Sequence, residues 1–291
     1  MNKIILIASL ILLGQSSFSQ MIPTYTKPKA TKPKSIAPKP AVVKTKIIYV
    51  DRPVSSATTE ETNTKSFEPQ MVFVPGGSFT IGSNESGDEK PIHSVSVNSF
   101  RMSKFEVTFA QYRFYCNATG TAMPEAPSWG LKDTYPIVNV SYEDATRYCN
   151  WLGSKTGKAY RLPTEAEWEF AARGGNNSSV YTYSGSNDIE EVAWYNGNSD
   201  GQAQACGGKR PNELGLYDMS GNVWEWCKDW YDRNYYSNSP SGNPRGPSSG
   251  AYRVSRGGSW INFAGNSRVA NRDYITPDYR HASIGFRLVC P

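Results

Sequence analysis

Histidine is scarce in this chain, with only His93 and His281 among its 291 residues. Three-histidine metal centres are therefore excluded, and an iron site of two histidines and one carboxylate would have to join two distant segments. Ser259 is also a poor candidate for a hydrolase nucleophile, because no Gly-x-Ser-x-Gly elbow surrounds it and no histidine base is near it.

Cysteine is limited to five residues, Cys116, Cys149, Cys206, Cys227 and Cys290. Because five is an odd number, at most two disulfides form in an oxidising compartment, and spacing does not reveal which cysteines pair. Cys149 falls on the inner face of a predicted helix and Cys227 follows a Trp-Glu-Trp run. We expect both to be buried as small apolar side chains.

Long hydrophobic runs are also lacking. The apolar run Ile4–Leu13 has about ten residues, whereas a membrane span needs ~20. Lys3 precedes this run and small residues end it at Ser19, which predicts a signal peptide over residues 1–19. We therefore expect an exported protein, periplasmic, secreted or at the cell surface, with no transmembrane segment after cleavage. The alternative is a signal that stays as a membrane anchor.

Aromatic residues are almost absent from residues 20–69, where proline and lysine alternate. This composition predicts a disordered, extended basic linker. Its function is either contact with an anionic surface or simple spacing. Residues 21–70 carry nine basic and four acidic side chains, so the rest of the mature chain has a net charge of about −1. Nucleic acid is therefore not an expected partner of the folded part.

Residues 70–291 have the size of one large domain and hold all eight tryptophans. Abundant Gly, Pro and Asn predict a loop-rich body with little regular structure. Met71–Gly82 is expected to form two short strands around a Pro-Gly-Gly turn, and residues 95–105 continue as strand.

Three helices are predicted from their N-terminal residues. Thr108, Ser141 and Thr164 are each followed three residues later by Gln, Asp or Glu, which is the pattern of a capping box. Gly120 is a suitable end for the first helix. Glu165 and Glu169 lie four apart on the third helix, where an acid–base pair is one interpretation and a favourable charge at the helix start is the other.

Two stretches near the C-terminus carry candidate site residues. Asp218 and Glu225 flank a glycine turn, which is a weak calcium signal beside the alternative of a turn pinned by Trp224 and Trp226. The second stretch, 256–288, places a polar loop between a Gly-Gly-Ser-Trp turn and a final strand predicted over residues 284–289. Polar loops on fixed supports often form sites.

Several segments together resemble the formylglycine-generating enzyme (sulfatase-modifying factor) family. They are Val74–Phe79, Phe105–Thr108, Pro136–Ser141, Arg161–Glu169, Gly215–Trp226 and the stretch 256–287. The resemblance implies one α+β domain with the formylglycine-generating-enzyme fold, related to C-type lectins, with limited regular secondary structure. It also implies relatives as varied as sulfatase activators, iron-dependent sulfoxide synthases, ligand-binding variable proteins and scaffolds of gliding machinery.

The resemblance implies a structural calcium ion. The family's ligands correspond to the Asp218 side chain, the carbonyls of Gly221 and Val223, and the Glu225 carboxylate. The family's other calcium site falls near residues 192–202. It stays unassigned, because Val192 replaces a ligand there.

Copper is not expected, although the activating enzymes of the family hold it with two cysteines in the loop after the Gly-Gly-Ser turn. Here that loop, residues 261–267, has no cysteine, and Asn262 stands where the first is expected. Soft thiolates select Cu(I), whereas amide oxygens do not. Ser259 and Arg272 keep the family's pocket residues.

We therefore expect a family member without catalytic cysteines that acts at the cell envelope. It would bind a protein or envelope ligand or serve as a scaffold, as in gliding machinery. The alternative is an active formylglycine-generating oxidase acting on a sulfatase cysteine. The expected ligand-binding residues are Ser259, Trp260, Asn262, Arg272, Asp278, Arg280 and His281, with Phe263, Asn266, Tyr274 and Tyr279 beside them.

Overall fold

The computed structural model describes residues 67–291, so the predicted signal peptide and nearly all of the predicted linker lie outside the described residues. Its helices and strands, in chain order, are β1 (Met71–Val74), β2 (Gly77–Ile81), β3 (His93–Val97), β4 (Phe100–Ser103), α1 (Phe109–Thr119), α2 (Tyr142–Thr156), α3 (Glu165–Ala172), α4 (Ile189–Val192), β5 (Trp224–Trp230), β6 (Arg253–Arg256), β7 (Arg272–Ile275), β8 (Ile284–Gly285) and β9 (Val289–Cys290). Three short 3₁₀ turns, at Gly175–Asn177, Tyr235–Ser237 and Ala264–Ser267, lie between them.

The three main helices begin where the sequence predicts. Thr108, Ser141 and Thr164 are the N-caps of α1, α2 and α3, and each forms both hydrogen bonds of a capping box. Gly120 ends α1 in the left-handed conformation, with φ of 71°. These predictions are confirmed. The sequence was sufficient for them because every contact that a helix cap needs lies within four residues.

The two predicted strands around the Pro-Gly-Gly turn are present, but they belong to different sheets. β1 pairs with β4, and β2 pairs with β3. Gly76 lets the chain pass close to the link between β3 and β4, since a Cβ atom there would lie 2.6 Å from the Ser99 nitrogen.

The predicted final strand, residues 284–289, is wrong in its extent. β8 pairs in parallel with β5, whereas β9 pairs antiparallel with β4. Phe286 and Leu288 cross between the four-stranded sheet β7-β6-β5-β8 and the three-stranded sheet β1-β4-β9, and both are fully buried. The apolar run therefore reflects a buried crossing, which sequence pattern does not distinguish from a strand.

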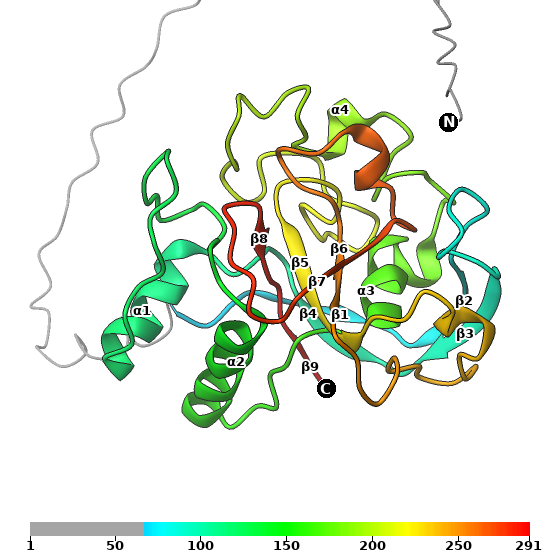
Figure 1. The fold of residues 1–291 in the computed structure, drawn as a ribbon, viewed down its shortest axis with the longest axis horizontal. Helices are drawn as coiled ribbons and strands as arrows, with labels where there is room; N and C mark the ends of the chain where they lie inside the picture. The colour runs from blue at the N-terminus through cyan, green and yellow to red at the C-terminus, as the bar shows by residue number, and fades with distance from the viewer. Residues whose placement is uncertain (1–66) are drawn as a thin grey trace, which may run out of the picture. The chain divides into compact units, whose positions relative to one another are not determined.

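Two large apolar clusters and one small one form the core of residues 67–291, the small one being Val138, Ala203 and Val223. One large cluster joins α1 and α2 to the β8 segment through rings such as Tyr112, Tyr148 and Phe286. The other surrounds Trp168 and Phe170 of α3 and reaches β2 and β3. In Figure 1, α1 and α2 lie on one side of the central β5–β6–β7 strands, and α3 with the β2–β3 hairpin lies on the other.

The domain is α+β, as predicted, with short helices and small sheets linked by long loops. No helix among residues 67–291 is long and apolar enough to cross a membrane.

Candidate functional site

The Gly-Gly-Ser-Trp turn after β6 needs both of its glycines. Gly257 and Gly258 have φ values of 99° and 76°, and a Cβ atom on Gly258 would lie 2.8 Å from the Ser267 hydroxyl oxygen. Beyond them, the Trp260 indole nitrogen donates to the Ala282 carbonyl at 2.9 Å, and the ring meets Trp129 edge-on. The loop that follows, residues 261–267, therefore starts from a fixed point.

Asn262 is held in place by its amide oxygen. This oxygen accepts a hydrogen bond from the Trp224 indole nitrogen at 2.9 Å and another from the Ser259 hydroxyl. The backbone carbonyl of Asn262 accepts a further hydrogen bond from the Asn196 backbone nitrogen at 3.0 Å. The family resemblance places the first copper ligand at residue 262. Asn262 offers only a hard amide oxygen there, and this oxygen already accepts two hydrogen bonds.

Ser259 and Arg272 are not available to a ligand, which corrects the sequence-based expectation. Ser259 is 0% exposed and Arg272 is 6% exposed. The Arg272 guanidinium donates to both Glu165 carboxylate oxygens, at 2.7 and 2.9 Å, and to the Asp88 carbonyl at 2.7 Å. Charged groups that are paired this fully away from water serve the fold.

Glu165 and Glu169 of α3 are neither an acid–base pair nor simply a favourable charge at the helix start. Both are buried within a network of ion pairs. Burial favours a higher pKa for Glu169, but the Arg173 and Arg256 guanidiniums outweigh it and lower that pKa.

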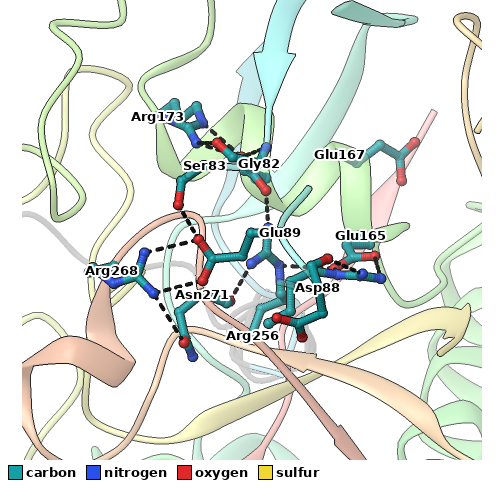
Figure 2. A network of polar contacts seen from close by, with 12 residues as sticks. Gly82, Ser83, Asp88, Glu89, Glu165, Glu167, Arg173, Arg256, Arg268 and Asn271 are labelled. Carbon is teal, nitrogen blue, oxygen red and sulfur yellow. Dashed lines mark hydrogen bonds and ion pairs between the residues drawn. The ribbon is translucent and has the colours of Figure 1, made fainter. Parts of the chain in front are cut away.

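The same network reaches the segment between β2 and β3. Figure 2 shows Arg268 donating to both oxygens of Glu89, at 3.0 and 2.6 Å. It also shows Arg256 beside Asn271, whose carbonyl accepts from that guanidinium. The C-terminal stretch is thereby fixed to α3 and to residues 82–89.

The remaining predicted ligand residues lie at the surface. Asp278, Tyr279 and Arg280 are exposed, and His281 is partly exposed and hydrogen-bonded to Ser283. Among the residues beside them, Phe263 is 75% exposed and Tyr274 is 47% exposed, whereas Asn266 is half-buried.

Arg280 also borders a cavity of about 400 Å³, which Arg147, Asp144 and Asn139 line with it. Arg280 and Arg147 both form ion pairs with Asp144. Arg280 therefore lies at a polar recess, and its chain neighbour Tyr279 is exposed.

The calcium set predicted from the resemblance is brought together but does not fit at Glu225. Both Glu225 oxygens are engaged, one by Trp168 at 2.7 Å and Arg287 at 2.6 Å, the other by Arg287 at 2.7 Å. A cation bound there would lie against a guanidinium. Asp218 differs, because one of its oxygens accepts from the Gly207 nitrogen at 2.7 Å and the other is buried without a partner among the described residues.

Sequence reasoning assigned no role to Glu106 or Cys206, which lie beside Asp218. One potential ligand atom from each of the three lies within 4.8 Å of the others. Glu106 accepts from the Cys206 thiol at 3.2 Å and from the Asn222 amide at 3.0 Å. Burial raises the pKa of Glu106, with the Asp218 and Glu225 carboxylates adding to it, and burial raises the pKa of Asp218 to about 6.

The five cysteines are all free thiols. Cys149 and Cys227 are buried, as predicted, and burial raises the pKa of every one of the five thiols.

Comparison with known proteins agrees with this fold. The family described as the sulfatase-modifying factor enzyme 1-like domain matches residues 56–290. The formylglycine-generating enzyme of Streptomyces coelicolor is 33% identical over 282 residues, covering 75% of this chain and 88% of that protein. The chain therefore belongs to the sulfatase-modifying factor family.

Solved structures give the same result. The chain superimposes on PvdO from Pseudomonas aeruginosa with a TM-score of 0.70 and 31% identity, covering 77% of this chain and 95% of that one. Treponema denticola variable protein 1 matches with a TM-score of 0.67 and 29% identity, covering 76% and 94%.

Proposed function

We propose that this chain is a sulfatase-modifying-factor-like recognition module of the cell envelope that does not oxidise cysteine through copper. The observation that carries the proposal is the state of Asn262. Asn262 stands where the resemblance places the first copper-binding cysteine, and its amide oxygen already accepts hydrogen bonds from Trp224 and Ser259. A soft ion has no thiolate to bind there.

The remaining thiols do not supply a substitute. Cys116, Cys149, Cys227 and Cys290 are buried, and Cys206 donates to the Glu106 carboxylate. Among residues 67–291, the one cluster of possible metal ligands that includes a cysteine holds a single thiol, Cys206, beside two carboxylates, and not the pair of cysteines that copper needs in this family. This chain therefore lacks the ligands for the copper that the family's oxidases use, whereas it keeps the Gly-Gly-Ser-Trp turn that precedes the copper-binding loop.

The C-terminal stretch 256–288, which includes the loop 261–267, favours recognition of a partner. Ile261 and Phe263 are 49% and 75% exposed, and Tyr279 is 45% exposed. Exposed aromatics beside charged residues such as Arg280 are typical of protein interfaces. Because the loop starts from the fixed Trp260 turn, its ordering cost on binding is small.

The catalytic part of the proposal is tested by copper loading and turnover. The purified chain is incubated with Cu(I) and a peptide containing Cys-x-Pro-x-Arg, with the Streptomyces coelicolor enzyme as positive control. We expect no stoichiometric copper and no mass loss from the peptide cysteine. One tightly held copper ion per chain together with peptide turnover would establish the alternative, an active oxidase.

The recognition part is tested by site-specific crosslinking in intact cells. A photoreactive amino acid replaces Phe263 in one variant and Phe73, which is 53% exposed on β1, in a matched control. We expect a discrete crosslinked product only from position 263. Equal crosslinking from both positions, or none from position 263, contradicts a binding role for the loop.

Export and tethering are proposed from residues 1–69. Cell fractionation of the wild-type chain and of a variant lacking residues 21–68 separates two roles. Loss of envelope localisation with the position-263 crosslink retained on the purified envelope would favour a scaffold role that needs the linker. Cytoplasmic wild-type chain with an uncleaved N-terminus would refute export.

A further inference from the structure

We propose that Glu106, Cys206 and Asp218 form a binding site for a zinc-like divalent cation. The three come from the loop before α1, the loop after α4 and the turn before β5. Their ligand atoms lie within 4.8 Å of one another, and Glu106 and Asp218 are 1% and 3% exposed.

Two carboxylate oxygens in this cluster point to a missing partner. One oxygen of Glu106 and one of Asp218 are buried and accept no hydrogen bond from any residue in the range 67–291. Buried polar atoms in native proteins are nearly always satisfied by protein, water or an ion. Both orphaned atoms belong to groups that already lie near the Cys206 thiol.

The local charge balance favours a divalent cation. Three buried carboxylates, Glu106, Asp218 and Glu225, share one guanidinium, Arg287. Arg287 directs its donors to Glu225 and to the carbonyls of Ser103 and Tyr217. Glu106 and Asp218 are therefore left without a directly bonded cation, and a buried carboxyl group without a partner is costly whether it is ionised or protonated.

The mixture of donors selects zinc over calcium. Calcium takes six to eight oxygen ligands and disfavours sulfur, whereas zinc accepts cysteine and carboxylate together. Zinc bonds of about 2.3 Å to sulfur and about 2.1 Å to oxygen, at a tetrahedral angle, separate the two ligands by about 3.6 Å. The Cys206 sulfur lies 3.2 Å from a Glu106 oxygen. On binding, the Cys206 thiol and any protonated carboxyl group of the cluster release their protons to water, a sulfur–zinc bond forms, and a water molecule takes the fourth position.

This site differs from the calcium set that the resemblance implies. The two sites share Asp218. The proposed zinc site uses Glu106 in place of Glu225, whose oxygens accept hydrogen bonds from Trp168 and Arg287, and it adds the Cys206 thiolate. It is also independent of the proposed function, because neither copper content nor peptide turnover enters its test.

The test uses the full chain after removal of metals with a chelator. Zn²⁺ and, separately, Ca²⁺ are added back, and bound metal is measured by mass spectrometry of the elements together with the melting temperature. Co²⁺ then replaces Zn²⁺, because a cobalt–thiolate bond gives a charge-transfer absorption band in the near ultraviolet. We expect one Zn²⁺ per chain, a higher melting temperature with Zn²⁺, and a charge-transfer band with Co²⁺.

Variants assign the ligands. Cys206→Ala should abolish the cobalt band, and Glu106→Gln should weaken zinc binding at least about tenfold. Cys116→Ala, which removes a thiol from the α1–α2 core cluster, is the matched control and should keep both.

Three results would overturn the proposal. They are the absence of the cobalt band from the wild-type chain, zinc retention that Cys206→Ala leaves unchanged, and tighter binding of Ca²⁺ than of Zn²⁺. The wild-type band decides the question even where a variant fails to fold.

Discussion

Replacing Arg272 with alanine should destabilise the fold rather than remove a ligand contact. The Arg272 side chain makes three hydrogen bonds, two of them to Glu165, and lies 4.1 Å from the centroid of the Tyr236 ring. Its removal leaves the 3%-exposed Glu165 without this partner. Breaking a buried pair on one side costs about 3–5 kcal/mol.

Urea unfolding followed by circular dichroism measures this cost. With a slope of about 2–3 kcal/mol per molar urea, the Arg272→Ala midpoint should fall by about 1–2.5 M. The matched control is Arg280→Ala, since Arg280 is also paired with a carboxylate, that of Asp144, but its side chain is 47% exposed. Exposed pairs contribute less than about 1 kcal/mol, so the control should unfold close to wild type.

A double-mutant cycle with Glu165→Gln separates the pair from its surroundings. The cost of Arg272→Ala should be smaller in the Glu165→Gln background, because no full carboxylate charge is then left unpaired. The reasoning is refuted if Arg272→Ala costs less than about 1 kcal/mol, or if its cost is the same in both backgrounds.

Three further predictions concern the fold around the site. Trp168→Phe removes the 2.7 Å hydrogen bond to the Glu225 carboxylate and should lower the free energy of unfolding in urea by about 1.5–3 kcal/mol. A decrease below about 0.5 kcal/mol would contradict this hydrogen bond. Gly221→Ala should lower the free energy of unfolding by about 2–5 kcal/mol, measured by calorimetry. The φ of Gly221 is 79°, and the new Cβ would lie 2.3 Å from the Trp194 carbonyl oxygen. An unchanged melting temperature would refute this close approach of the two backbones. Burial, followed by the Glu165 carboxylate, raises the pKa of Asp229 above 3.8, so its contribution to stability is complete below that pH and is lost as pH rises through the folded-state pKa. Asp229→Asn should therefore lose less stability than wild type as pH rises from about 4, and parallel unfolding free energies across that range would exclude the effect.

Local spacing in the sequence predicts the features whose contacts are local. The starts of α1, α2 and α3 follow from capping boxes that span four residues, and the Gly120 end of α1 follows from its left-handed backbone. The family resemblance likewise predicts the α+β fold, because the family's motifs occur in the family's order along residues 74–287.

The roles of the charged residues required the tertiary structure. Arg272 meets Glu165 across 107 positions of sequence, and Cys206 meets Glu106 across 100. Whether an arginine faces a ligand or a buried carboxylate depends on which distant segments are buried together, and spacing along the chain carries no record of that. Burial and long-range pairing therefore exclude Arg272 and Glu225 from the predicted sites and bring Glu106 and Cys206 to Asp218.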